Sequence, residues 1–282
     1  MNVNMGILLV LAASFVLSAM NAAVKFLTLQ GYPTLQITFF AGFIAFCCVF
    51  AWMALKKKLA TLKVFSPLLG LYILAAVGAG VSLFYAFGSG KLAEVGTIVA
   101  AAPLMIAGLA FFLLHERLRP FQAGLIVVGF LGILCMFKPR PELVGYEIFC
   151  WALFGTFLFS LSQIIVRKLK DSVPTLVFCF YFYLGFFAVT GLMMPYQSVS
   201  MTDVPFFLLT GACEIVSLVL LYSAFKLAPA SVVAPFQYSG VLWSALFGYV
   251  FWHERLDIWT LAGAAIIVGS GILFARSSQH DA

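Results

Sequence analysis

The sequence predicts an all-α integral membrane protein of ten transmembrane helices, built as two inverted five-helix repeats around a central cavity. Hydrophobic residues make up 64% of the 282-residue chain and charged residues only 9%, whereas a soluble domain carries about 25% charged residues. Long apolar runs follow one another along the chain, and the short turns between them hold most of the charges. The turn His115-Glu116-Arg117-Leu118 returns as His253-Glu254-Arg255-Leu256, close to half a chain length later.

Charge, Pro and Gly clusters divide the apolar runs into ten expected spans. Helices are expected because lipid cannot satisfy free backbone groups, and each run is close to the roughly 20 residues that a helix needs to cross a bilayer. The first run has no Lys or Arg before it and no evident cleavage site, so we interpret it as a span and not as a signal peptide. The expected spans are 6–27, 34–55, 67–88, 94–114, 120–137, 145–167, 174–194, 204–225, 230–252 and 258–275.

The distribution of Lys and Arg predicts that both termini are cytoplasmic. With the N-terminus inside, eleven of the sixteen basic residues fall in cytoplasmic turns and five fall outside, as the positive-inside rule requires. The clusters at Lys56–Lys58 and Arg167–Lys170 contribute most to this difference. Because the basic residues orient membrane segments, the net charge of +6 does not indicate nucleic-acid binding.

The repeat extends beyond the charged turn. Each half of the chain, 1–140 and 141–282, holds five expected spans. Because five is an odd number, the second half must be inverted relative to the first, and inverted repeats are typical of secondary transporters that work by alternating access. The other matching segments are Pro33-Thr34-Leu35 with Pro174-Thr175-Leu176, Ala86-Phe87 with Ala224-Phe225, and Asn21 and Lys25 with Gln163 and Arg167.

With these features the chain resembles the EamA type of the drug/metabolite transporter (DMT) superfamily over nearly its whole length. The resemblance rests on the two His-Glu-Arg-Leu turns, on the Gly pattern of the spans that follow them, and on Tyr85-Ala86-Phe87. The aromatic richness and the length most resemble the YddG-type exporters of aromatic and neutral amino acids. Many members carry an Arg in the second span, where this chain has Thr38-Phe39-Phe40, so an anionic-substrate role there is not supported. The resemblance implies export of small metabolites across the bacterial inner membrane, through a central cavity.

Glu214 is the most costly residue to place in a membrane. It lies about midway along the eighth expected span, where an ionised side chain costs about 2.5–3.5 kcal/mol on insertion scales. We therefore expect it to face a cavity or a partner, as a proton-coupling group or as the site of a substrate amine. The alternative is a protonated acid that bonds a neighbouring helix. Ser217 lies on the same helical face and should line the same space.

Several polar side chains in other spans are candidates for the cavity wall. Asn21 and Gln163 occupy equivalent positions, and their amides suit either a substrate or a bond between helices. Lys25 and Arg167 are interpreted as residues that snorkel to the membrane interface. Together with Glu214 and Ser217, the predicted cavity residues are Ser14, Ser18, Asn21, Gln163, Gln237, Tyr238 and Trp243.

The sequence carries neither a His-Glu-x-x-His nor a Gly-x-Ser-x-Gly motif, so we expect no enzyme activity, cofactor or metal site. His115 and His253 should fall on opposite sides of the membrane, where they cannot share an ion. We expect His115, Glu116, Arg117, His253, Glu254 and Arg255 to fix two hairpins at the membrane surface. The Gly rows, Gly124 with Gly132 and Gly263 with Gly271, are interpreted as close-packing faces or as a dimer contact.

The expected function is secondary transport of small metabolites, with neutral and aromatic amino acids as substrates, by a monomer or homodimer in the lipid bilayer. One alternative is a transporter of a nucleotide, a cofactor or a drug-like compound. Phosphates would require several Arg or Lys residues in the cavity, and the spans offer few beyond Lys25. Two alternatives from other classes are an intramembrane enzyme, which the missing catalytic motifs disfavour, and a non-transporting scaffold, which the inverted halves disfavour.

Overall fold

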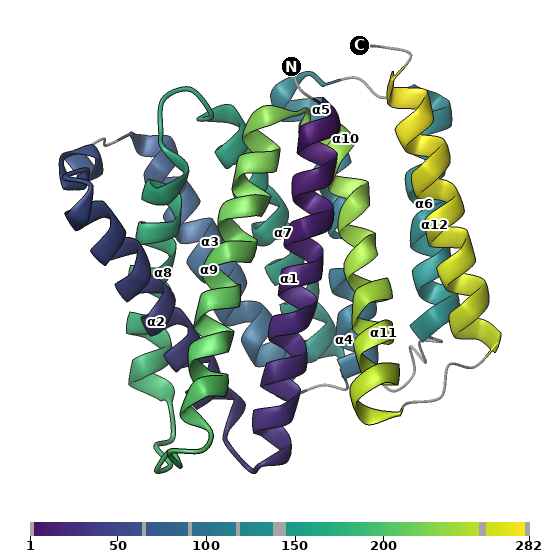
Figure 1. The fold of residues 1–282 in the computed structure, drawn as a ribbon. Coiled ribbons are helices and arrows are strands. Elements are labelled where there is room, and N and C mark those ends of the chain that lie inside the picture. Colours follow the sequence, from purple (N-terminus) through teal and green to yellow (C-terminus); the bar gives the residue numbers. More distant parts are fainter. Residues whose placement is uncertain are drawn as a thin grey trace.

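The computed structural model describes residues 3–63, 66–89, 92–116, 119–137, 145–253 and 258–279. All regular structure in these ranges is helical (Figure 1). Within them, seven helices are long and apolar enough to cross a membrane. These are α1 (Val3–Leu29), α2 (Thr34–Leu55), α3 (Pro67–Ser89), α7 (Tyr146–Lys168), α8 (Thr175–Met193), α9 (Val204–Leu227) and α12 (Ile258–Gln279).

The expected fourth and ninth spans are each divided into shorter pieces. α4 (Leu92–Val99) ends before α5 (Ala102–Leu114) begins, and Pro103 lies in the first turn of α5. α10 (Ala230–Val233), the 3-10 helix η3 (Ala234–Tyr238) and α11 (Ser239–Trp252) occupy the ninth span, with Pro235 at the start of η3. Proline donates no backbone hydrogen bond and its ring crowds the preceding turn. The expectation of one continuous helix is therefore wrong at both places.

The remaining described elements are the shorter apolar helix α6 (Pro120–Phe137) and the 3-10 turn η1 (Leu59–Lys63). The outer surface carries large apolar side chains: Leu74 and Phe112 are each 73% exposed and Leu192 is 90% exposed. Such exposure suits a surface that faces acyl chains, which are as apolar as leucine.

The two His-Glu turns have the same backbone conformation where they begin. His115 ends α5 and His253 ends α11, both in the left-handed region, with φ of 55° and 52°. Their backbone N–H groups donate to Ala110 O and Gly248 O, each five residues back. A non-glycine residue with positive φ is uncommon, and among the described residues these two histidines share it only with Lys57, just after α2.

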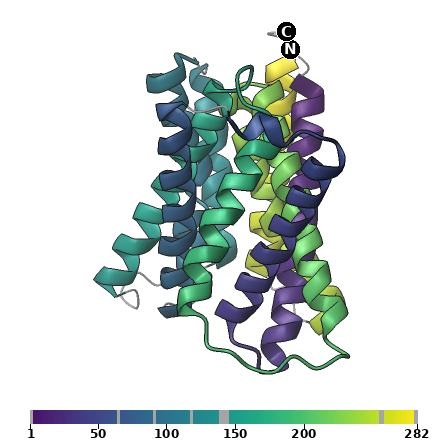
Figure 2. The same ribbon diagram turned by 90° about the vertical axis from the view of Figure 1, so that its left-hand side faces the viewer.

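Most of the close helix packing joins a helix of the first half of the chain to a helix of the second half (Figures 1 and 2). α1 packs against α9 and α11, whereas α7 packs against α3 and α5. α2 contacts α8, and α6 lies beside α12. α1 begins and α12 ends at the same end of the molecule, which we call the termini end.

The two predicted close-packing faces meet between α6 and α12, but only one glycine of each face lies at the contact. A Cβ atom on Gly132 would lie 3.0 Å from Gly263 O, and a Cβ atom on Gly263 would clash with Gly132 O. Gly124 and Gly271 have no such neighbour, since nothing lies within 4 Å of a Cβ atom added at either. The two helices therefore approach most closely at Gly132 and Gly263, as small residues permit.

Candidate functional site

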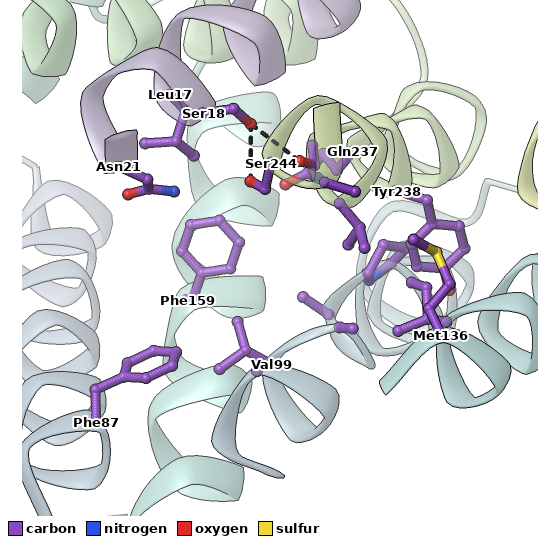
Figure 3. A pocket seen from close by; sticks show the side chains of 18 of the residues that line it. Leu17, Ser18, Asn21, Phe87, Val99, Met136, Phe159, Gln237, Tyr238 and Ser244 are labelled. Carbon is purple, nitrogen blue, oxygen red and sulfur yellow. Dashed lines mark hydrogen bonds between the residues drawn. The ribbon is translucent and has the colours of Figure 1, made fainter. Parts of the chain in front are cut away.

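A cavity of about 560 Å³ lies among the helices. Helices α1, η3 and α11 provide the polar part of its wall, with Ser18, Asn21, Gln237 and Ser244 (Figure 3). Apolar side chains such as Phe87 and Val99 lie across from Ser18, Ser244 and Gln237. A cavity of this size, mostly apolar with a few polar groups, is typical of a small-molecule site.

Ser18 and Ser244 join the two helices on the polar side of this cavity. The Ser18 hydroxyl donates to Gly240 O at 2.9 Å, and Ser244 Oγ donates to Ser18 Oγ at 3.2 Å. The Asn21 side chain is exposed and lines the same cavity. These hydrogen bonds hold α1 against α11, so that the polar side chains of both helices lie in the cavity wall.

A second cavity of about 230 Å³ adjoins the first. The two share Leu17, Phe159, Gln237 and Gly240 in their walls, so we describe them as the larger and the smaller lobe of one cavity. The smaller lobe is lined on α1 by Ser14 and on α9 by Glu214, Ser217 and Tyr222. Gln237 belongs to both lobes and marks the neck between them.

Glu214 is half-buried in the wall of the smaller lobe. Ser217 Oγ donates to the main-chain carbonyl of Glu214 at 2.9 Å, not to its carboxylate. Within the described part of the chain, that carboxylate has no hydrogen-bond or ion-pair partner. An acidic side chain that faces a cavity inside an apolar protein is a candidate functional group by default.

The structure places most of the predicted cavity residues together, with two exceptions. Ser14, Ser18, Asn21, Glu214, Ser217, Gln237 and Tyr238 line one or both lobes. Gln163 and Trp243 line neither. Gln163 is fully buried, and its amide nitrogen and oxygen have no hydrogen-bond partner in the described structure. Trp243 packs edge-on against Phe15, with ring centroids 5.2 Å apart.

Several wall residues were not predicted from the sequence. Leu17, Phe159, Phe182 and Met136 are apolar, and nothing in their local sequence separates them from lipid-facing residues. Gly240 and Ser244 could have been predicted from the sequence, because they are four residues apart on one face of α11 and follow the polar Gln237.

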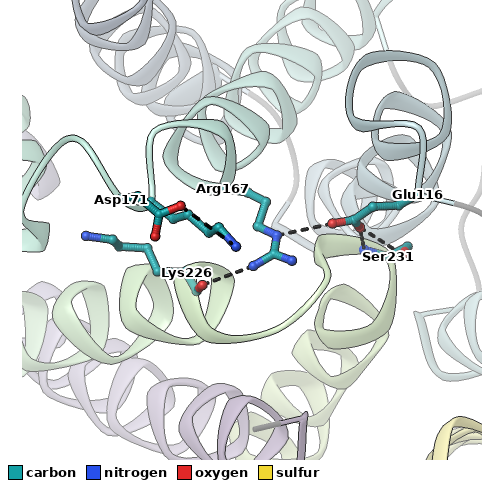
Figure 4. Close-up of polar contacts among 6 residues, drawn as sticks. Glu116, Arg167, Asp171, Lys226 and Ser231 are labelled. Atoms are coloured by element: carbon teal, nitrogen blue, oxygen red, sulfur yellow. Dashed lines mark hydrogen bonds and ion pairs between the residues drawn. The ribbon is translucent and has the colours of Figure 1, made fainter. Parts of the chain in front are cut away.

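Polar contacts join several helix ends at the termini end (Figure 4). Glu116 Oε1 accepts a hydrogen bond from Arg167 Nε at 3.1 Å, and Glu116 Oε2 accepts from Ser231 N and Ser231 Oγ at 3.1 and 3.0 Å. Arg167 also donates from its terminal nitrogen to Lys226 O at 3.0 Å. We call these residues the Glu116 cluster. It joins the turn after α5 to the ends of α7 and α9 and to the start of α10.

The expectation that Arg167 snorkels to the interface is wrong, because Arg167 is 8% exposed and paired with Glu116. Lys25, at the matching position, lies 4.5 Å from the centroid of the Trp252 ring. His115 and His253 are exposed at their turns. Arg117, Glu254 and Arg255 lie outside the described residues, so their predicted part in the hairpins stays a prediction.

Other contacts join the loops at the opposite end of the molecule. Tyr32 Oη donates to Asp203 Oδ2 at 2.8 Å and accepts from Ser200 N at 3.0 Å. Gln36 exchanges two hydrogen bonds with the backbone of Gln197, of 2.6 and 3.0 Å. The connection between α1 and α2 is thereby held against the connection between α8 and α9.

A membrane protein that is helical throughout its described part and holds a mostly apolar cavity with a few polar groups belongs, as a class, with the carriers of small molecules. The sequence profile of the EamA-like transporter family matches this chain twice, at residues 4–138 and 147–276. The chain belongs to the EamA-like transporter family. It is therefore a multi-pass membrane transporter for small molecules and not an enzyme.

Two relatives whose activities are known are also transporters of small molecules. The pseudopaline exporter CntI of Pseudomonas aeruginosa is 25% identical over 97% of both chains. An S-adenosylmethionine uptake transporter of Rickettsia prowazekii is 26% identical over 66% of both chains. A solved crystal structure matches the fold with a TM-score of 0.81 over 96% of both chains, at 18% identity. The expected EamA membership is confirmed, while the narrower resemblance to amino-acid exporters finds no support among these relatives.

Proposed function

We propose that this protein is a secondary transporter that moves a small amphipathic metabolite by alternating access, with the two-lobed cavity as its substrate site. The observation that carries this proposal is the polar wall of the cavity. Glu214, Gln237 and Asn21 face an internal space in a chain with few polar residues to place. Polar groups at this depth are costly, so a site that binds a polar substrate accounts for them.

Ten crossings in two inverted halves, 1–140 and 141–282, are part of this proposal. Exchanging the halves turns α1 into α7, α3 into α9, α5 into α11 and α6 into α12. The contact of α1 with α9 then becomes that of α7 with α3, and the contact of α1 with α11 becomes that of α7 with α5. The double match to the family profile and the shared conformation of His115 and His253 also support the exchange.

The proposed mechanism requires the cavity to open toward one end at a time. Asn21, in the last third of α1, and Thr260, in the first turn of α12, line the larger lobe on the side away from the termini end. The Glu116 cluster lies at the termini end, beside α10. We therefore propose a state that is closed at the termini end. With cytoplasmic termini in a bacterial inner membrane, as the Lys and Arg distribution predicts, this state faces outward.

The proposed substrates are neutral or aromatic amino acids and their derivatives. The residues that line the two lobes include no Lys or Arg within the described part of the chain. A nucleotide would leave its phosphates without the cationic partners that they require. A relative that takes up S-adenosylmethionine, a derivative of an amino acid, supports the broader class of substrates.

Counterflow in proteoliposomes tests the proposal. The purified protein is reconstituted with unlabelled L-phenylalanine, L-methionine or S-adenosylmethionine inside, and entry of the same radiolabelled compound is measured, with nucleotides as a comparison set. We expect exchange for at least one amino acid or derivative and none for the nucleotides. Uptake equal to that of empty liposomes for every compound would refute the proposed transport.

A further inference from the structure

We propose that the smaller lobe is a subsite for the positively charged amine of the substrate, with Glu214 as its counter-charge, and that the larger lobe holds the rest of the molecule. This inference rests on the proposed transport function and names the substrate class more closely. It also assigns different parts of the substrate to the two lobes.

The balance of charge in the cavity is the first observation. Glu214 is the one acidic residue among the described residues that line the two lobes, and no Lys, Arg or His lines them there. A carboxylate away from water requires a cationic or hydrogen-bonding partner. Because no described residue supplies one, an occupant of the lobe is the natural source of the compensating charge.

The neighbours of Glu214 are already engaged or uncharged. Ser217 Oγ binds a main-chain carbonyl. Tyr222 Oη lies 2.8 Å from Tyr72 Oη, which also donates to Phe178 O at 3.1 Å. The titratable groups that interact electrostatically with Glu214 are Cys213 on its own helix, Cys179 and Tyr183 on α8, and Tyr222. None of these groups can become a cation, so none can substitute for a substrate amine.

The neck between the lobes supplies a complementary donor. Gln237 Nε2 is buried and has no hydrogen-bond partner within the described structure. An amide N–H donates to a carboxylate or carbonyl oxygen, so Gln237 suits an oxygen that lies next to the amine. A carboxylate on one side and an N–H donor on the other match the two charged ends of an α-amino acid.

The wall of the larger lobe fits an apolar body. Phe87, Val99, Ile133 and Met136 line it, and the polar groups Ser18 and Ser244 are already bonded to each other. The lobe therefore offers mainly apolar contact area to a side chain that extends past Gln237. Together the lobes specify an amine, an adjacent oxygen and an apolar or aromatic extension.

Matched pairs of ligands test the charge directly. Binding to the purified full-length protein is measured by calorimetry for L-phenylalanine against 3-phenylpropionate, which lacks the amine, and for phenethylamine against 2-phenylethanol. L-Methionine against 4-(methylthio)butanoate, which also lacks only the amine, extends the comparison to a second side chain. We expect the member with the amine to bind at least about tenfold more tightly in each pair that binds, the scale of one charge-assisted hydrogen bond.

Variants assign that preference to the proposed groups. Glu214→Gln should abolish the preference for the amine, while Glu147→Gln, the same change at an exposed carboxylate that lines neither lobe, should retain it. Gln237→Ala should reduce the advantage of L-phenylalanine over phenethylamine. Because Glu214→Gln keeps the shape of the side chain, a melting temperature equal to that of the wild type verifies that it folds.

Three outcomes would overturn the subsite. They are equal affinity within the pairs, no binding of any member, and a preference that survives Glu214→Gln. If the preference survives while Glu214→Gln loses the pH dependence of binding, Glu214 carries a proton and does not bind a substrate amine. If another class of compound still exchanges in proteoliposomes, the transport function stands while this subsite fails.

Discussion

Glu116 uses both oxygens of its carboxylate, one on Arg167 and one on Ser231. The side chains of Arg167 and Glu116 are 9% and 15% exposed. A partly buried pair of this kind contributes less by its own attraction than it costs when one partner is removed. Replacing either Glu116 or Arg167 should therefore lower the stability of the fold, because the other charge would be left without a partner.

Replacing Glu116 with Gln should destabilise the protein, because the buried guanidinium of Arg167 would lose its counter-charge. We expect a loss of up to about 3 kcal/mol, the lower end of the range for breaking a buried pair, seen as a lower melting temperature in detergent. His115→Gln is the matched control, since His115 is the exposed residue next to Glu116. Equal melting temperatures for the two variants would show that the ion pair does not hold the termini end.

The environment of Tyr32, at the opposite end of the molecule, predicts that stability depends on pH. The hydrogen bond from the Ser200 N–H acts to lower the pKa of Tyr32, but the hydrogen bond to Asp203, burial and the negative charge of Asp203 together raise that pKa above 10.0. The folded state therefore favours the protonated phenol. The contribution of Tyr32 to stability is full below the unfolded pKa and is lost as pH rises through the folded pKa.

Above about pH 10, the melting temperature of the wild type should therefore fall more steeply with pH than that of Tyr32→Phe. At neutral pH, Tyr32→Phe should melt lower, because the bonds to Asp203 and Ser200 are missing. Tyr196→Phe is the control, since Tyr196 lies in the same connection between α8 and α9 and is 75% exposed. Parallel pH curves for wild type and Tyr32→Phe would contradict the assignment.

At the scale of the helices, the contact between α6 and α12 depends on two small residues at one level. The peptide groups of Gly132 and Gly263 meet where a Cβ atom on Gly263 would clash with Gly132 O and a Cβ atom on Gly132 would lie 3.0 Å from Gly263 O. Close backbone approach of this kind gives dispersion contacts that lipid cannot replace. Like Gly132, Gly124 lies on α6, but nothing lies within 4 Å of a Cβ atom added at Gly124.

This difference predicts opposite effects from one substitution on one helix. Gly132→Ala should destabilise the protein by about 1–3 kcal/mol, the usual cost of overpacking. Gly124→Ala should be neutral or stabilising by up to about 1 kcal/mol, because alanine is the better helix former. Thermal melting of both variants in the same detergent checks the pair. No loss at Gly132 would mean that helix packing there is looser than the structure shows, and a similar loss at both positions would show that the close approach of the two backbones is not its cause.

The same scale shows how much the sequence can predict. The expected span 34–55 coincides with α2 because Pro33 ends the preceding turn, and 145–167 lies within one residue of α7. The breaks at Pro103 and Pro235 were missed because hydropathy continues unbroken across them. Glu214 and Gln237 were predictable from the cost of polar groups in lipid. The contact of Arg167 with Glu116 was not, because it depends on packing between residues far apart in the chain.

For the whole molecule, the proposed inversion means that the two ends of the cavity are built from equivalent segments. Exchanging the conformations of the halves would then open the closed end and close the open one. The Glu116 cluster must separate in that exchange, since it joins the turn after α5 to α7 and α10. The contacts of Tyr32 and Gln36 with the connection between α8 and α9 join elements of both halves in the same way.

Side-specific labelling tests this organisation. In a cysteine-free background, Lys56→Cys and Ser198→Cys are made one at a time and labelled with a membrane-impermeant maleimide in intact cells and in inverted vesicles. Lys56 follows α2 and Ser198 lies between α8 and α9; both are exposed and they occupy opposite ends of the molecule. The positive-inside rule predicts that Lys56→Cys reacts only from the cytoplasmic side and Ser198→Cys only from the outside. Reaction of both from one side would refute the arrangement of crossings. Reaction from opposite sides in the reverse sense would refute only the orientation and would make the state described here open to the cytoplasm.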